Sequence, residues 1–487
     1  MLKQILAPRL AKGLVLSALL SVAGLHAAPE PAAPARPEPV ERARPEPAER
    51  AAVDGFSYVK SAGGFDEYRL EANGLQVLLM PDHSAPVITL MVTYRVGSRN
   101  EVTGTTGATH LLEHLMFKGS TNFNTEKGNK VDQILDPIGA TNNATTSVDR
   151  TNYYETFGSE HLPMVVEMEA DRMRGLLLRD SDRQPEMTVV RNEFERGQNN
   201  PIQALFLELG AYAYIAHPYH HSTIGWRSDI EKVSIEKLRE FYDTFYWPDN
   251  ATVTVIGDFD PAAALGLVGK FYGTIPKSPK PIPQIYTEEP AQSGPRRFVI
   301  KRAGQLGAVA IGHKIPAGTH PDFPAIQVLA AILGNGKNAR LYRSLTDQSL
   351  STGVFTYARF THDPMLHYTF VPLAPGVTHD KVEKIALADI EKLKRDGVTE
   401  AEVQSAINQL LADSAFQRDG TFAIAAQLNE CIAVGDWTLY ETLDQATAKV
   451  TAADVKRVAN LYFNEDQSTT GWFIALDPEA TPAPAAK

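Results

Sequence analysis

The segment VSIEKLREFYDTFYWPDNATVTVIGD, residues 233–258, recurs in outline as VTAADVKRVANLYFNEDQSTTGWFIALD, residues 450–477. Both segments begin with a Val-Ser or Val-Thr pair that can start a helix and continue through an amphipathic stretch to an aromatic pair. A polar turn and an apolar run follow in each. A shared order of helix, turn and strand is the signature of an internal repeat. The sequence therefore predicts two related halves.

Apolar patterns mark further elements of the first half. The runs LQVLLM (75–80) and PVITLMVTYRV (86–96) flank a polar turn and predict two strands. A long helix is predicted downstream, because apolar residues recur there at helical spacing: Leu162, Val165, Val166, Met173, Leu176 and Leu177. Adjacent strands mixed with helices fit the α+β class better than alternating βαβ units.

A proline-rich stretch divides the two halves. PKSPKPIPQIYTEEPAQSGP, residues 276–295, lacks apolar periodicity and is typical of a linker. It separates an N-terminal domain at 56–275 from a C-terminal domain at 296–476, and a tail follows at 477–487. We predict an α+β fold of two homologous α/β-sandwich halves with mostly antiparallel sheets, arranged as a clamshell around a cavity.

The N-terminus has the pattern of an export signal. Three cationic residues, Lys3, Arg9 and Lys12, precede the apolar run at 13–25, and small residues follow at Ala27 and Ala28. This order predicts a secretory signal peptide over residues 1–28. The apolar run is shorter than the about 20 residues that a membrane-spanning helix needs. The alternative to a cleaved signal peptide is an uncleaved membrane anchor. The composition of residues 29–55 predicts a disordered Pro/Ala-rich linker. We expect a periplasmic protein with no stable membrane span after signal cleavage.

The net charge limits the possible partners of the chain, and the cysteine count limits its disulfides. The net charge of −11 argues against nucleic acid as a partner, because phosphate contacts need clustered Lys and Arg. Cys431 is the only cysteine, so the chain has no intrachain disulfide. We expect Cys431 to be a small buried side chain rather than a nucleophile.

Residues 106–120, TGATHLLEHLMFKGS, hold the first candidate site. On a helix His110 and His114 lie one above the other, with Cβ atoms about 5–6 Å apart. Both imidazoles could then reach one zinc ion. Glu113 would stand beside that ion, where a general base takes a proton from water. The order reverses that of the H-E-x-x-H zincins but supplies the same three groups. The alternative is a surface helix with two exposed histidines.

A third zinc ligand has a candidate in PEMTVVRNEFERGQNNP, residues 185–201. Pro185 suits the first turn of a helix. Glu186 and Glu193 are seven apart, so both project from one face, and Val189-Val190 between them places that face against the protein. Carboxylates that point toward a core are costly unless they are paired or bind a metal.

Together the two motifs resemble those of the pitrilysin-type inverted zinc peptidases, the superfamily of insulin-degrading enzyme and mitochondrial processing peptidase. HLLEH followed nearly eighty residues later by E-x6-E is the pattern of that superfamily. The resemblance covers most of the chain, from about residue 60 to 475. It extends to GATNNATTSVDRTNYYE (139–155), HPYHHSTIGW (217–226) and LGNGKNARLYRSL (333–345).

The resemblance implies a role for each of these residues. One zinc ion per chain would be bound by His110, His114 and Glu193. Glu113 would be the base that activates water, and Glu186 would be an acid that supports the site. Substrate binding is implied at Asn143, Ala144 and Phe117. Asn143 and Ala144 belong to a predicted edge strand, to which an extended or unfolded peptide would add by main-chain hydrogen bonds. From its position alone, Phe117 is more often a core residue.

Three other histidines are not assigned to the metal. His217, His220 and His221 surround Pro218 and Tyr219, a context that predicts a surface turn.

The second half departs from the superfamily pattern. It contains no equivalent of HLLEH, and its SLTDQSLSTGVF segment (344–355) has Thr346 where the superfamily has Arg and Gly353 where it has Tyr. Neither residue supplies a cationic or phenolic donor. Arg340 and Arg343 are out of register, and Tyr357 is four residues too late unless a shifted loop places it in the site.

We therefore expect a zinc endopeptidase for peptides or unfolded chains, in a heterodimer with a related non-zinc subunit that supplies the Arg and Tyr. One alternative is a non-hydrolytic subunit that binds peptides or scaffolds a complex. The intact set of histidines and glutamates disfavours it. Another alternative is a structural zinc site, which would need four protein ligands where only three candidates are found.

Overall fold

A computed structural model describes residues 53–198 and 200–476 of the chain. The predicted signal peptide, most of the predicted 29–55 linker and the predicted tail lie outside the described residues. Within the described part, no helix combines the length and the apolar character that crossing a membrane requires. The two halves belong to one compact unit that begins at Val53.

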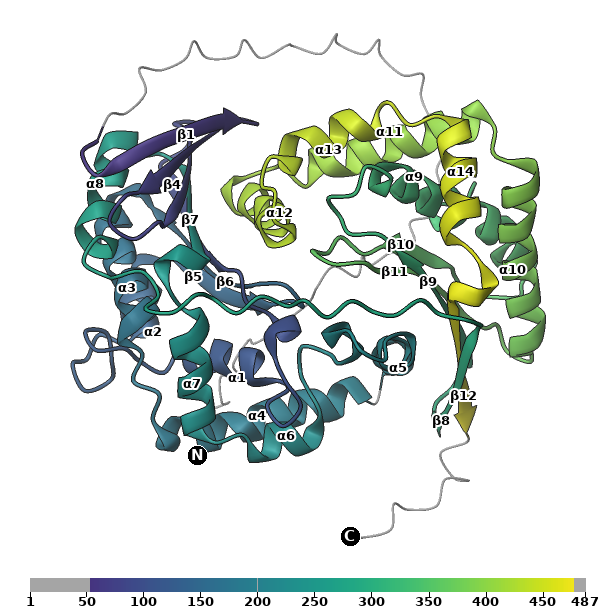
Figure 1. Ribbon diagram of the computed structural model, residues 1–487, viewed down its shortest axis with the longest axis horizontal. Helices are drawn as coiled ribbons and strands as arrows, with labels where there is room; N and C mark the ends of the chain where they lie inside the picture. The colour runs from purple at the N-terminus through teal and green to yellow at the C-terminus, as the bar shows by residue number, and fades with distance from the viewer. Residues whose placement is uncertain (1–52, 199, 477–487) are drawn as a thin grey trace, which may run out of the picture. The chain divides into compact units, whose positions relative to one another are not determined.

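The N-terminal half is built on a seven-stranded mixed sheet with strand order β1-β2-β3-β7-β4-β6-β5 (Figure 1). All neighbouring pairs are antiparallel except β3 and β7. The strands are β1 (Phe56–Ala62), β2 (Phe65–Leu70), β3 (Gln76–Pro81), β4 (Val87–Tyr94), β5 (Thr141–Thr146), β6 (Thr151–Gly158) and β7 (Ala251–Gly257). The helices are α1 (Ala108–Leu115), α2 (Val131–Leu135), α3 (Leu162–Gly175), α4 (Asp180–Gln198), α5 (Pro201–Ala213), α6 (Arg227–Lys232), α7 (Ile235–Phe245) and α8 (Pro261–Tyr272).

The C-terminal half is built on a five-stranded sheet with strand order β10-β11-β9-β12-β8, in which only β12 and β8 are parallel. The strands are β8 (Arg296–Ala303), β9 (Ala308–Ile315), β10 (Phe355–Ala358), β11 (Met365–Pro372) and β12 (Ser468–Leu476). The helices are α9 (Phe323–Gly334), α10 (His379–Asp396), α11 (Glu400–Phe416), α12 (Thr421–Val434), α13 (Leu439–Thr447) and α14 (Ala452–Tyr462).

The strand orders confirm the predicted repeat and the α+β class with mostly antiparallel sheets. Read from the parallel pair outward, β3-β7-β4-β6-β5 and β8-β12-β9-β11-β10 have the same topology. In the first half, five helices (α3 to α7) lie between β6 and β7. In the second half, five helices (α10 to α14) lie between the equivalent strands, β11 and β12. The side chains of Ser234 and Thr451 cap α7 and α14, as expected for helix-starting Val-Ser and Val-Thr pairs.

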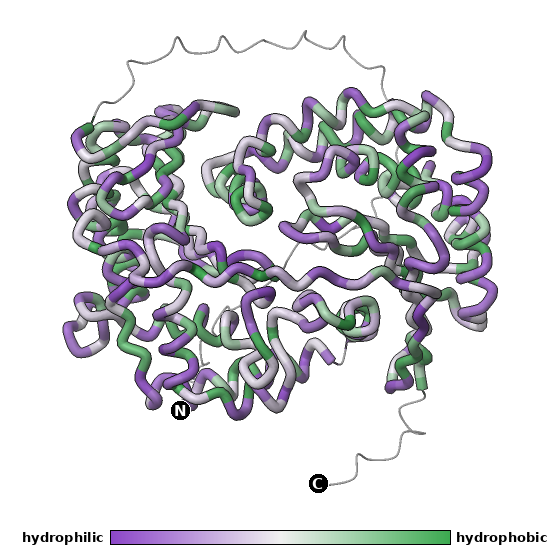
Figure 2. The backbone as a smooth tube through the Cα atoms, in the orientation of Figure 1, coloured by the Kyte–Doolittle hydropathy of each residue, from purple (hydrophilic) through white to green (hydrophobic). Residues whose placement is uncertain are grey.

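The halves exchange equivalent helices. Helix α5 belongs to the first half in sequence, yet it packs on β8, β9 and β12 of the second half through apolar residues that include Leu205 and Leu209. Its counterpart α12 packs on β4, β6 and β7 of the first half, through residues that include Leu428 and Cys431. Figure 2 shows α12 as largely hydrophobic, whereas α10 is mostly hydrophilic. Each sheet therefore completes its core with a helix from the other half, and Cys431 is buried as predicted.

Two local predictions were wrong. Helix α4 begins at Asp180, so Pro185 lies inside the helix rather than at its start. Ion pairs of Arg183 with Asp180 and of Arg179 with Asp182 stabilise the additional first turn. The segment at 217–221 contains a 3₁₀ turn, but His217 and His221 are each only 4% exposed. It is not a surface turn, because the second half contacts it.

Two histidines lie in the core of the second half. His313 on β9 and His367 on β11 are cross-strand neighbours, and both rings pack on Phe463. Neither ring is more than 1% exposed, and Nδ1 of His313 and both ring nitrogens of His367 have no hydrogen-bond partner among the described residues. Burial lowers the pKa of each histidine from its ordinary 6.5 to about 3.

This pair predicts an acid-sensitive core. Between pH 6.5 and about 3 the unfolded chain binds protons that the folded chain does not, so stability is full above pH 6.5 and falls as pH decreases. We expect each histidine to lower the free energy of unfolding by on the order of 1 kcal/mol per pH unit in that window. Urea unfolding near pH 7 and near pH 5 measures the effect.

The double variant His313→Leu/His367→Leu should lose most of this dependence, because neither new side chain titrates. The control is His83→Gln, since His83 has a side chain 67% exposed. An unchanged pH dependence in the double variant would show that the pair does not contribute.

Candidate metal centre

Helix α1 carries the HLLEH residues and is fixed at its N-terminus. It begins after Gly107, which has a φ of 85°, a conformation that favours glycine. A Cβ atom at this position would also lie only 2.4 Å from the carbonyl oxygen of Ile224. The Glu101 carboxylate accepts hydrogen bonds from the backbone N–H groups of Gly107 and Thr109, each at 2.8 Å. These bonds satisfy donors that a helix N-terminus leaves unpaired.

Helix α4 packs beside α1 and brings Glu193 to the two histidines. The Glu193 Oε2 atom lies 3.7 Å from His110 Nε2 and 3.8 Å from His114 Nε2. One ligand atom from each residue lies within 4.8 Å of the other two, and no other group of three such residues is found in residues 53–198 and 200–476. Ligands at about 2.0–2.2 Å from one zinc ion need this kind of spacing.

The pKa values of the two histidines shift in opposite directions. Burial lowers the pKa of His110 to about 3, so its imidazole is neutral, as a metal ligand must be. At His114 burial has the same tendency, but a hydrogen bond to Glu186 and the charges of Glu113 and Glu193 raise the pKa above its ordinary value. The carboxylates thus favour a positive charge at His114, and a divalent cation would supply one.

Glu186 lies beside His114 but does not belong to the group formed by His110, His114 and Glu193. One carboxylate oxygen lies 3.0 Å from His114 Nδ1 and the other pairs with Lys118. Burial would raise the pKa of Glu186, but these two hydrogen bonds bring it below its ordinary value. A carboxylate on the distal nitrogen orients a ligand histidine and sets its tautomer.

Glu113 lies on the same helix and is only 5% exposed. Burial raises the pKa of its carboxyl, and a hydrogen bond from the Thr146 hydroxyl opposes that rise. A buried carboxylate with a raised pKa has the properties of a general base.

The predicted substrate-binding residues lie on two elements. Strand β5 is the edge of its sheet, with Asn143 exposed and Ala144 1% exposed. The Ala144 N–H donates to the side chain of Asn143 at 2.9 Å. Phe117 is half-buried; its ring lies 6.2 Å from that of Tyr153, and the Arg172 guanidinium lies over it.

The C-terminal half places no ligand at this centre. Helix α9, which follows β9 as α1 follows β4, is apolar and buried except at the half-buried Gln327. Thr346 ends a π-helical turn, and its hydroxyl lies 2.9 Å from that of Ser351. Arg340 is bonded to Glu402. Tyr357 lies on β10, 40% exposed and stacked on Tyr368.

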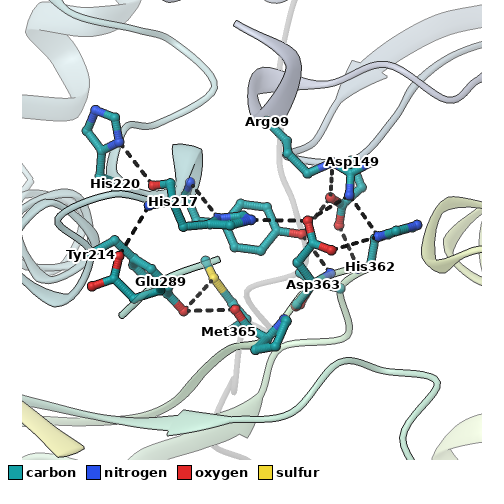
Figure 3. A network of polar contacts seen from close by, with 12 residues as sticks. Arg99, Asp149, Tyr214, His217, His220, Glu289, His362, Asp363 and Met365 are labelled. Atoms are coloured by element: carbon teal, nitrogen blue, oxygen red, sulfur yellow. Dashed lines mark hydrogen bonds and ion pairs between the residues drawn. The ribbon is translucent and has the colours of Figure 1, made fainter. Parts of the chain in front are cut away.

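A polar network next to the β5–β6 turn was not foreseen from the sequence (Figure 3). Arg99 donates to Asp363 at 2.7 Å, and His217 Nε2 lies 3.1 Å from the same carboxylate. Asp149 accepts hydrogen bonds from the Tyr219 hydroxyl at 2.6 Å and from His362 N at 3.0 Å. Because Asp363 and His362 belong to the second half, the network joins the two halves.

Glu101 and Thr146 were also missed. Thr146 ends strand β5, two residues after Ala144 of the predicted edge strand, but its contact with Glu113 joins positions 33 residues apart. No local spacing rule predicts such a contact.

Comparisons with known proteins agree with this geometry. A family model described as insulinase (peptidase family M16) matches residues 76–226, and one described as the peptidase M16 inactive domain matches residues 232–410. The chain is 33% identical over 403 residues to the zinc protease PqqE of Helicobacter pylori, covering 82% of this chain and 90% of the relative. It is 24% identical to a mitochondrial-processing peptidase subunit beta of Lentinula edodes, covering 87% and 92%.

A solved structure agrees as well. The crystal structure of a protease from Helicobacter pylori superposes with a TM-score of 0.79 at 31% identity, covering 86% of this chain and 99% of the other.

The metal ligands can be tested by zinc affinity. Glu193→Gln should weaken zinc binding by tenfold or more, because a neutral amide replaces an anionic ligand. Glu186→Gln should weaken it by about 10–100-fold through its effect on His114. The control Glu195→Gln changes an exposed glutamate of the same helix and should leave affinity unchanged. Competition with a chromogenic chelator measures all three. Wild-type affinity in Glu193→Gln would remove Glu193 from the ligand set.

Proposed function

The chain belongs to peptidase family M16, the insulinase family, and is a zinc metalloendopeptidase; on that premise we propose that it hydrolyses peptides or unfolded polypeptides at a single zinc ion held by His110, His114 and Glu193. The observation that carries the proposal is the convergence of these three side chains from two helices, with Glu113 beside them.

Each residue has a separate task in the proposed reaction. When bound, zinc acts as a Lewis acid that activates water and polarises the scissile carbonyl. Glu113 takes the proton of the attacking water and delivers it to the leaving amine. Glu186 holds the His114 ring so that Nε2 faces the ligand set.

Strand β5 supports binding of an extended substrate. Its outer edge has no neighbouring strand in the described residues, so a peptide can add to it by main-chain hydrogen bonds. The Ala144 N–H now donates to the Asn143 side chain, and a substrate carbonyl would replace that acceptor. Phe117 would contact a substrate side chain. Most strands of a folded protein are already paired with their neighbours, so extended or unfolded chains are favoured.

A related subunit would complete the active site. Thr346 and Gly353 stand where the family supplies a cationic and a phenolic donor, and a homodimer would lack the same groups twice. The relative from Lentinula edodes is itself called a subunit, which supports a chain that works in a complex. We propose a heterodimer in which this chain brings the metal and the base, and its partner brings Arg and Tyr.

The location proposed is the periplasm. The support is the order of cationic, apolar and small residues in the first 28 positions.

Replacing the base separates hydrolysis from metal binding. Glu113→Gln should lower kcat by 10²–10⁴-fold or more, because the amide cannot accept a proton at neutral pH, while zinc content stays at one ion per chain. Peptide hydrolysis and zinc analysis of the same preparation measure both. Near-normal turnover with Glu113→Gln would show that the base is elsewhere.

The heterodimer is tested by reconstitution. A missing transition-state donor typically costs 10²–10³ in rate, so the isolated chain should be a poor enzyme and a related subunit lacking HxxEH should raise kcat by about that factor. Arg→Ala and Tyr→Phe changes in the partner should remove the gain. Full activity of this chain alone, insensitive to the partner, would contradict the proposal and turn attention to Tyr357.

A further inference from the structure

The Glu113 carboxylate has one hydrogen-bond donor among the described residues, the hydroxyl of Thr146. Thr146 is the last residue of β5, so the donor comes from the strand that forms the sheet edge. The bond holds Oε2 of the carboxylate, and within residues 53–198 and 200–476 no donor is bonded to Oε1. A buried side chain with a single partner takes its orientation from that partner.

The turn that follows Thr146, residues 147–150, is held by the N-terminal half. The carbonyl of Ser147 accepts from Ser98 N at 3.2 Å, and that of Val148 accepts from Arg99 N at 2.9 Å. Gly97 permits this approach, because a Cβ there would lie 2.4 Å from both carbonyl oxygens. The turn therefore has a fixed position against the segment after β4.

The C-terminal half holds the same turn at two further points. Arg150 binds Glu430 of α12, with Nε 3.1 Å from the carboxylate, and donates through Nη1 to the carbonyl of Thr145 at 2.9 Å. The backbone N–H of His362 donates to Asp149 at 3.0 Å (Figure 3). A chain of contacts thus runs from α12 through Arg150 and Thr145 to the residue that binds Glu113.

From these contacts we infer that Thr146 is a positioning residue for the base Glu113, and that Glu430 of the C-terminal half keeps it in place through Arg150. The inference rests on the proposed function, because it takes Glu113 as the base. It adds a role for the second half within this chain: that half contributes no metal ligand but maintains the orientation of the group that takes the proton. Substrate pairing with β5 would take place on the same strand.

The first test compares two replacements of Thr146. Thr146→Val keeps the size and removes the hydroxyl, and Thr146→Ser keeps the hydroxyl. We expect Thr146→Val to lower kcat by about 10–100-fold, the cost typical of losing a hydrogen bond to a charged group. KM and zinc content should stay near wild type. Thr146→Ser should restore most of kcat.

Equal losses in Thr146→Val and Thr146→Ser would overturn the inference, as would wild-type kcat in Thr146→Val. If Thr146→Val does not fold, Thr146→Ala against Thr146→Ser makes the same comparison. Zinc is measured in every variant and kcat is expressed per zinc-loaded chain, so that loss of metal cannot imitate loss of position.

The second test addresses the C-terminal half. Glu430→Gln should lower kcat by several-fold with zinc content unchanged, because Arg150 loses its charged partner. The control Glu391→Gln, which changes an exposed glutamate paired with Lys394 in α10, should keep wild-type kcat. Wild-type kcat in Glu430→Gln would overturn the link to the second half.

Glu113→Gln distinguishes this inference from the proposed function. If that variant is inactive while Thr146→Val is normal, the positioning role fails and the base assignment stands. If Glu113→Gln is active, the base assignment itself fails.

Discussion

The exchange of helices α5 and α12 between the two sheets is the constraint on which the rest of the structure depends. Neither sheet has a complete apolar core without the helix that the other half supplies. Hydrogen bonds also join the two halves, including those of Thr93 with Asn429 and of Glu67 with Trp437. The geometry between the halves is therefore a consequence of core packing, which is dense and tolerates little displacement.

Helix α4 connects the exchanged helix α5 to the candidate metal centre. Helix α5 follows α4 directly in sequence, and Arg302 of β8 donates to the carbonyl of Gln198, the last residue of α4, at 2.9 Å. Glu193 lies about one and a half turns before that end. Two candidate ligands, the histidines, thus come from a helix fixed within the N-terminal half, and the third candidate comes from a helix whose end is fixed to the C-terminal half. A site built in this way would be sensitive to both halves even though one of them supplies every candidate ligand.

Comparing α1 with α9 shows that the site carries a free-energy cost, the burial of polar side chains on α1. The two helices occupy equivalent places in the repeat, but α9 is apolar except at Gln327, whereas α1 buries His110 and Glu113 and half-buries His114. Burying a carboxylate is unfavourable unless it is paired or binds a cation. Here Glu186 and Glu193 face His114 from α4, and Lys118 pairs with Glu186. A divalent cation among these groups would offset most of the remaining cost.

The sequence predicted what local spacing determines. Repeat order and the strands at 75–80 and 86–96 follow from periodicity, and the spacing of HLLEH indicates two candidate ligands; the choice of Glu193 as the third came from the resemblance to the pitrilysin-type peptidases. The structure places the three ligand side chains together, although the role of each remains a proposal. The exchange of α5 and α12 was not predicted, because an apolar helix face does not reveal which sheet it covers. His217 and His221 were placed at the surface for the same reason: their partners, Asp363 and Glu101, are distant in sequence.

The most direct measurement is anomalous diffraction from crystals of the purified chain, alone or in its active complex, recorded on both sides of the zinc absorption edge. A single strong peak is expected between His110 Nε2, His114 Nε2 and Glu193 Oε2, at about 2.0–2.2 Å from each atom. The absence of any peak, or a peak bound by other residues in active protein, would contradict a catalytic zinc centre built from α1 and α4.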